Sequence, residues 1–128
     1  PTREGVAPIA AFDPYHSHSG AEFFTCAQVG YEAAGQSRMA ACAQAEGAWT
    51  YIRSADFGAG CRALWATVRG NGFIEVRLDR RDASPIASIP ARTQGYTEVC
   101  VPLEVSGVHD VYFAFTGKNV CLRTWQAE

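Results

Sequence analysis

Two short polar motifs in this sequence have the residue types for metal binding or acid–base catalysis. His16 and His18 flank Ser17, a spacing that metal ligands use, but no matched third ligand accompanies them in this Ser/Gly loop. His109 and Asp110 could exchange a proton, yet they stand at the entry to an expected strand, with no activated nucleophile beside them. We interpret both motifs as solvated turns, and we predict no catalytic residue, no metal ligand and no cofactor.

Hydrolysis of a glycosidic bond would require two carboxylates, one on each side of the bond that is cut. The candidates Glu75, Asp79 and Glu98 fall on exposed faces of expected strands, and the sequence implies no pocket around them. An independent enzyme therefore has little support, and we predict that this chain is not an enzyme.

Several large aromatic residues stand on the sides of expected strands that should face away from the core. Trp49 and Tyr51 share one side of "AWTYI", and Tyr112 takes the outward side of "VYFAF". A merely solvated sheet face would carry polar residues at such positions. Trp65 points outward on a further strand, near an acid and a base. The predicted face comprises Trp49, Tyr51, Trp65, Glu75, Arg77 and Tyr112.

Aromatic rings beside charged side chains suit the binding of sugars. The C–H faces of sugar rings stack on aromatic rings, while carboxylates and guanidinium groups orient the hydroxyls. If these strands lie in one sheet, the residues form a floor on which an oligosaccharide could lie. An interface with another domain, or a loop folded over the face, explains the same pattern equally well.

The elements that carry these residues are short strands. "LWATVRGNGFIEVRLD" contains two alternating runs around Asn71 and Gly72, a pair that favours a tight hairpin turn. Other alternating runs are "IAAF", "AEFFTC", "SRMAACA", "AWTYI", "PIASIP", "YTEVCVPL", "HDVYFAF" and "VCLRTW". Ten short strands with almost no helix signal predict an all-β fold, an antiparallel β-sandwich or jelly roll. The predicted core includes Leu64, Val68, Ile74, Val76, Leu78, Val111, Phe113 and Phe115.

Length and composition limit the classes of partner. The chain has 128 residues and is 48% hydrophobic, which predicts a single domain over residues 1–128 with a substantial core. Its 11 basic and 13 acidic residues are scattered singly, so we expect no nucleic acid and no membrane surface as partner. The chain begins at Pro1, and we expect it to be a piece of a longer protein.

The five cysteines are an odd number, and none forms a C-x-x-C pair. At most two disulfides are possible. Small buried or edge thiols are the favoured interpretation over a structural metal site. The cysteine pattern does not distinguish an oxidising from a reducing compartment.

The order of these signals resembles the family 6 carbohydrate-binding modules. An "ADFGAG" turn precedes "LWATV" and "IEVRLD", and "YTEV", "SGVHDVYFAFTG" and Asn119 follow in the family's order. The resemblance runs from about Ile9 to Trp125. It implies a galactose-binding-like β-sandwich attached to a plant-polysaccharide hydrolase, with a plant oligo- or polysaccharide and the parent catalytic domain as partners. It also slightly favours an extracellular location.

The family's usual sugar cleft lies in loops at one end of the sandwich, where a Tyr and a Trp hold a sugar ring and an Asn fixes it. In this sequence the Tyr position falls on Ala43, and only Asn119 remains in place. The Trp should precede "YTEV", where residues 92–94 read Arg-Thr-Gln, unless Tyr96 substitutes for it. We therefore expect weak or no sugar binding in the end cleft, although Asn119 stays among the candidate carbohydrate-binding residues.

The resemblance also implies a structural calcium, partly held by carboxylates on the first strand and just after the C-terminal Asn. The matching positions read Ala10, Phe12 and Cys121. A hard cation needs several oxygen ligands, so we predict no calcium here unless Asp13 compensates.

Two hypotheses about function remain. In the first, the chain is a non-catalytic module of a xylan- or arabinan-degrading hydrolase and binds plant cell-wall glycans through its aromatic surface, because the family can also use the concave face of one sheet. In the second, it is a degenerate β-sandwich that has lost sugar binding and braces its parent hydrolase or an oligomer. Exposure of Trp49, Trp65 and Tyr112 would favour the first hypothesis.

Overall fold

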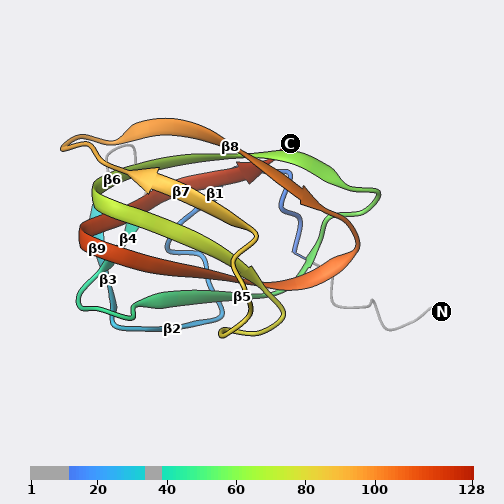
Figure 1. Cartoon of the computed structure of the whole chain (residues 1–128), viewed down its shortest axis with the longest axis horizontal. Coiled ribbons are helices and arrows are strands. Elements are labelled where there is room, and N and C mark those ends of the chain that lie inside the picture. The colour runs from blue at the N-terminus through green and yellow to red at the C-terminus, as the bar shows by residue number, and fades with distance from the viewer. Residues whose placement is uncertain (1–11, 34–38) are drawn as a thin grey trace.

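Two long bent strands form the framework of the molecule. The computed structural model describes residues 12–33 and 39–128, and every regular element among them is a strand (Figure 1). None of these residues belongs to a helix that is long and apolar enough to cross a membrane. The strands are β1 (His18–Ser19), β2 (Thr25–Ala27), β3 (Val29–Ala33), β4 (Met39–Ala43), β5 (Trp49–Asp56), β6 (Cys61–Leu78), β7 (Ala87–Ala91), β8 (Thr97–Val105) and β9 (Val108–Ala127).

Strands β6 and β9 pair antiparallel along almost their whole length and belong to both layers of the sandwich. Both turn back at the same end of the molecule, at the left in Figure 1. The C-terminal half of β6 and the N-terminal half of β9 form one layer, in the order β7-β6-β9-β5-β2. Their other halves form the second layer with β8 on one side, and with β4, β3 and β1 on the other. The predicted antiparallel β-sandwich is confirmed.

The predicted hairpin at Asn71 and Gly72 is wrong. Both residues lie inside β6, because each half of this strand pairs with β9 and not with the other half. Gly72 is opposite Gly117, and a Cβ on Gly72 would lie 1.9 Å from the carbonyl oxygen of Thr116. Glycine is therefore needed here for close approach of two bending strands, and not for a tight turn.

The runs "HDVYFAF" and "VCLRTW" likewise merge into the single strand β9. The predicted strand "IAAF" lies outside the described residues except for Phe12, which forms an isolated bridge with Ala55.

The core lies between the two layers, and its predicted composition is confirmed. Phe113, on the first half of β9, contacts Trp125 on the second half with ring centroids 5.3 Å apart. The two ends of one strand thus meet across the core. Seven of the predicted core residues are at most 2% exposed, and Leu78 is partly buried against them: Leu64, Val68, Ile74, Val76, Val111, Phe113 and Phe115.

Candidate functional site

Three aromatic residues form a continuous strip on the outer face of the β7-β6-β9-β5-β2 layer. Tyr51 of β5 is directly opposite Tyr112 of β9, and their rings stack with centroids 4.7 Å apart. Trp49 meets Tyr112 edge to face at 5.9 Å. All three side chains are partly exposed, as expected for residues that alternate with the buried Thr50, Val111 and Phe113.

Two charged residues lie beside this strip on β6. Arg77 is paired with Tyr112 and Glu75 with Ala114, so both share the outer face of the same layer. Their ion pair is 2.6 Å long. Arg77 also donates hydrogen bonds to the carbonyl oxygens of Arg81 (3.4 Å) and Ala83 (2.9 Å), which ties the loop at residues 79–86 to the sheet.

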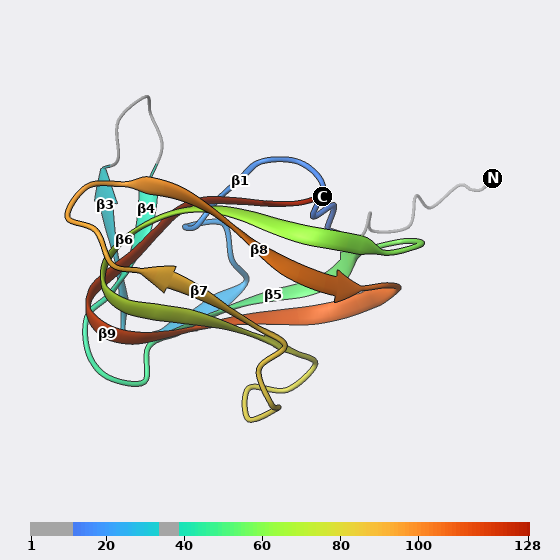
Figure 2. The same ribbon diagram turned by 45° about the horizontal axis from the view of Figure 1, so that its top comes forward.

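The loop at residues 79–86 makes the face hollow rather than flat. It stands away from the sheet at the lower edge of Figure 2. A hollow of about 500 Å³ is lined in part by Trp49, Glu75, Arg77 and Arg81. A neighbouring hollow of about 290 Å³ is lined by Trp49, Arg81, Asp82 and Tyr112.

Sequence patterns missed two residues of this face. Arg81 lies in an irregular loop, and its guanidinium carbon is 5.3 Å from the centroid of the Trp49 ring. Phe24 precedes β2, is 63% exposed and meets Tyr51 edge to face at 5.9 Å. Alternation assigns faces only within strands, so it carried no information about Arg81. Phe24 falls in the expected strand "AEFFTC", but the structure begins β2 only at Thr25.

Tyr51 is held as a neutral donor at the end of the strip. Its hydroxyl donates to the Asp110 carboxylate at 3.2 Å. Burial and this hydrogen bond raise the pKa of Tyr51, so the phenol keeps its proton near neutral pH.

Trp65 does not belong to this face. It lies on the other half of β6, paired with Cys100 and Gln126, and therefore on the outer face of the opposite layer. Its side chain is 39% exposed, and its indole N–H donates to Glu128 at 2.6 Å. The prediction grouped Trp65 with Glu75 and Arg77 because it treated residues 64–79 as a hairpin within one sheet. The bend in β6 separates them.

Asn119 is also remote from the strip. It is exposed, has a φ of 57°, and lies at the bend of β9 between the two layers. Of the predicted site residues, the structure thus brings together Trp49, Tyr51, Glu75, Arg77 and Tyr112 and leaves out Trp65 and Asn119.

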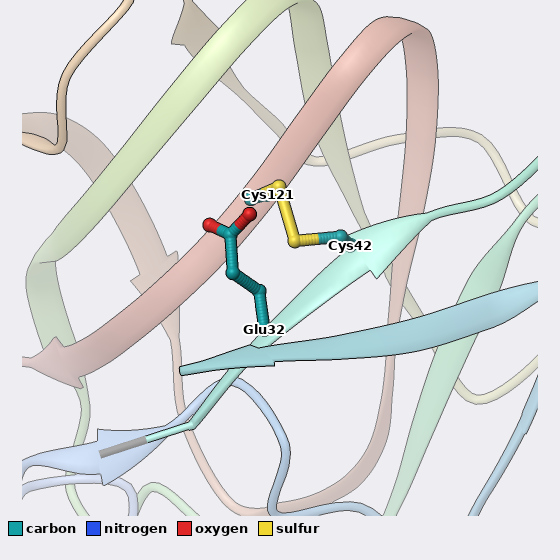
Figure 3. A group of neighbouring side chains, drawn as sticks. All are labelled: Glu32, Cys42 and Cys121. Atoms are coloured by element: carbon teal, nitrogen blue, oxygen red, sulfur yellow. A yellow bond between two sulfur atoms is a disulfide. The ribbon is translucent and has the colours of Figure 1, made fainter. Parts of the chain in front are cut away.

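The bend of β9 carries a disulfide between Cys42 and Cys121, which corrects the interpretation of these two cysteines as thiols. Figure 3 shows the Glu32 side chain beside the two sulfur atoms. The sulfurs are bonded to each other, and the Glu32 carboxylate accepts hydrogen bonds from Arg69 and Tyr96. This cluster is therefore a structural crosslink and not a metal site. Cys26, Cys61 and Cys100 are free.

Tyr96 packs over this crosslink rather than presenting an open ring. It is partly buried against Cys42 and Cys121, and its hydroxyl donates to Glu32 at 2.6 Å. Burial and the hydrogen bond to Glu32 raise the pKa of Tyr96 to about 12. A ring fixed in this way has its hydroxyl occupied and one side covered, which makes it a poor substitute for a sugar-stacking Trp.

The positions matched to the family's calcium ligands do not fit a calcium ion. Phe12 stacks on Trp125 at 5.7 Å, and Cys121 is consumed in the disulfide. Ala10 lies outside the described residues. One carboxylate oxygen of Asp13 accepts from the backbone of Tyr15 and the other lies 3.1 Å from His16. The absence of calcium stays a prediction.

The interpretation of the histidine motifs as solvated turns is wrong for His18 and His109, which belong to β1 and β9. Both ring nitrogens of His18 have hydrogen-bond partners, the Glu22 carboxylate at 3.1 Å and the Asp13 carbonyl at 2.5 Å. His109 lies between Asp79 and the Ser106 carbonyl, each at 2.8 Å, and the hydrogen bond to Asp79 raises its pKa. Neither ring is directed at the aromatic strip.

Comparison with solved structures gives strong matches. The chain superimposes on a family 6 carbohydrate-binding module from Clostridium cellulolyticum, in complex with xylose, with a TM-score of 0.80. The two share 24% identity over 91% of this chain and 98% of that one. A family 6 module from Clostridium stercorarium, in complex with cellobiose, gives a TM-score of 0.83 at 19% identity over 93% and 97% of the two chains.

This chain has the fold of a family 6 carbohydrate-binding module. The resemblance seen in the sequence is thereby confirmed. These matched neighbours are carbohydrate-binding modules over almost their whole length, and that this chain is not an enzyme stays a prediction.

A family 43 arabinoxylan arabinofuranohydrolase from Bacillus subtilis, in complex with cellotetraose, also contains this fold. It matches with a TM-score of 0.82 and 28% identity over 96% of this chain. The chain spans only 29% of that enzyme, so a module of this fold can be part of a glycoside hydrolase. No sequence profile of a protein family and no curated protein matches the chain.

Proposed function

We propose that this family 6 fold binds an oligosaccharide on the strip formed by Trp49, Tyr112 and Tyr51. The observation that carries the proposal is the contiguity of three partly exposed rings beside a hollow of about 500 Å³. The rings offer apolar contact to sugar C–H faces, and Glu75 offers an acceptor to hydroxyls, while Arg77 holds Glu75 and the adjacent loop in place.

The finer assignment is to plant cell-wall glycans, within a xylan- or arabinan-degrading hydrolase. The matches to xylose- and cellobiose-bound modules and to an arabinoxylan arabinofuranohydrolase support it. The Cys42–Cys121 disulfide supports an extracellular location, because disulfides persist in oxidising environments.

We expect Trp49→Ala to weaken binding to xylo-oligosaccharides or arabinoxylan by about tenfold or more, because it removes a stacking surface that lines both hollows. Calorimetry with oligosaccharides and retention in polysaccharide-containing gels would measure this loss. Tyr112→Ala should act in the same direction.

Trp65→Ala is the matched control, since it removes the same side chain from the opposite layer and should leave binding unchanged. Asn119→Ala should also have no effect. Tight binding that depends on Asn119 or Trp65, and not on Trp49, would contradict the proposal. If the protein binds no glycan and Trp49→Ala releases a neighbouring domain, the bracing function is favoured instead.

A further inference from the structure

We infer that the glycan on this face carries carboxylate groups, as uronic-acid sugars do, and that Arg81 is the residue that binds them. The inference rests on the proposed function and names the chemical class of its ligand. It follows from the distribution of charge along the aromatic strip.

Glu75, Arg77, Arg81 and Asp82 are the charged residues that line the two hollows, and their charges sum to zero, but they are not all paired. Glu75 neutralises Arg77 through their 2.6 Å ion pair. Asp82 lies 3.5 Å from Arg80. Among the residues that the structure describes, no carboxylate lies within ion-pair distance of Arg81. Arg81 is therefore the one charged residue lining the hollows that has no ion-pair partner among the described residues.

Arg81 occupies the position from which it could reach a ligand on the strip. Arg81 and Trp49 are the two residues shared by both hollows. The guanidinium is also 5.3 Å from the centroid of the Trp49 ring. A planar guanidinium binds a carboxylate with two parallel hydrogen bonds, so a uronic-acid sugar beside Trp49 would meet both apolar contact and charge.

Arg77 positions Arg81 rather than competing for the ligand. Its guanidinium donates to the carbonyls of Arg81 and Ala83, and to the carboxylate of Glu75. These bonds tie the loop at residues 79–86 to β6. The Nε atom of Arg77 is also buried and has no hydrogen-bond partner.

Two nearby acidic residues on the same layer already have hydrogen-bond partners, and they line neither hollow. The Asp110 carboxylate accepts from the Ser54 backbone and from the Tyr51 hydroxyl. Asp79 accepts from His109 and from the backbone of Asp110. A carboxylate ligand at Arg81 would thus not face an unpaired acid among the residues that line its site.

The test compares acidic oligosaccharides with neutral counterparts of the same size. The probes are a xylo-oligosaccharide with one glucuronic-acid branch and trigalacturonate, each also prepared with its carboxyl groups reduced to alcohols. We expect the protein to bind at least one acidic probe about tenfold more tightly than its reduced form at low salt, and the preference to shrink as salt is raised.

Arg81→Gln should abolish this preference, so that the acidic probe and its reduced form bind with equal affinity. Arg80→Gln is the matched control, because it removes the same charge from the adjacent, largely exposed residue and should keep the preference. Equal affinity for acidic and reduced probes, no binding of either acidic probe, or equal loss in both variants would overturn the inference. If the protein binds the reduced probe and Trp49→Ala weakens that binding, the proposed function stands and only the preference for carboxylates fails.

Discussion

Phe113→Ala is expected to lower the free energy of unfolding by about 3–5 kcal/mol, because it removes a large ring from the centre of the core. Phe113 is 1% exposed and packs against Trp125 of the opposite layer, so the cavity would open between the two layers. A domain of this size has a total stability of about 5–15 kcal/mol, and the variant would be close to unfolding. Urea denaturation followed by tryptophan fluorescence measures the difference.

Phe24→Ala is the control for this experiment. It makes the same chemical change at a ring that is 63% exposed, and it should cost less than about 1 kcal/mol. Similar losses in the two variants would show that Phe113 does not lie in the core as described.

Removal of the Cys42–Cys121 disulfide is expected to cost about 2–5 kcal/mol, since the bond closes a loop with a sequence separation of 79 residues. In the unfolded chain this crosslink restricts more than half of the sequence. Cys42→Ala combined with Cys121→Ala should lower the free energy of unfolding by that amount. Reduction of the parent protein should reproduce most of the loss.

The controls follow from the three free cysteines. Cys100→Ala changes an exposed thiol and should shift stability by less than about 0.5 kcal/mol. Thiol titration of the denatured, unreduced protein should count three free thiols out of five cysteines. A count of five, or a double variant as stable as the parent, would contradict the crosslink.

Much of the fold could be predicted because alternation reports directly on burial. Val111, Phe113 and Phe115 alternate with Tyr112 and Ala114, and the structure places the first three in the core. The same rule gave the outward direction of Trp49, Tyr51 and Tyr112. It failed at Asn71 and Gly72, because a turn signal in the local sequence does not reveal that a distant strand pairs with both halves.

The candidate site could be predicted only in part, because strand order is a long-range property. Glu75 and Arg77 join Tyr112 since β6 pairs with β9, and Trp65 is excluded by the bend in the same strand. Arg81 comes to the site through carbonyl contacts with Arg77, which no periodic pattern encodes. The disulfide likewise depends on Cys42 being directly opposite Cys121 across paired strands.

The sequence by itself determined that this chain is an all-β protein with outward-facing aromatic residues, because the two-residue period of a strand fixes which side chains share a face. The order of its motifs determined the resemblance to family 6 carbohydrate-binding modules. The tertiary structure alone decided which aromatic residues lie together, which cysteines are joined and that the Arg81 guanidinium lies beside the strip without an acidic partner among the described residues. Those outcomes depend on pairing between residues far apart in the chain, on the bends in β6 and β9, and on the loop that Arg77 ties to β6.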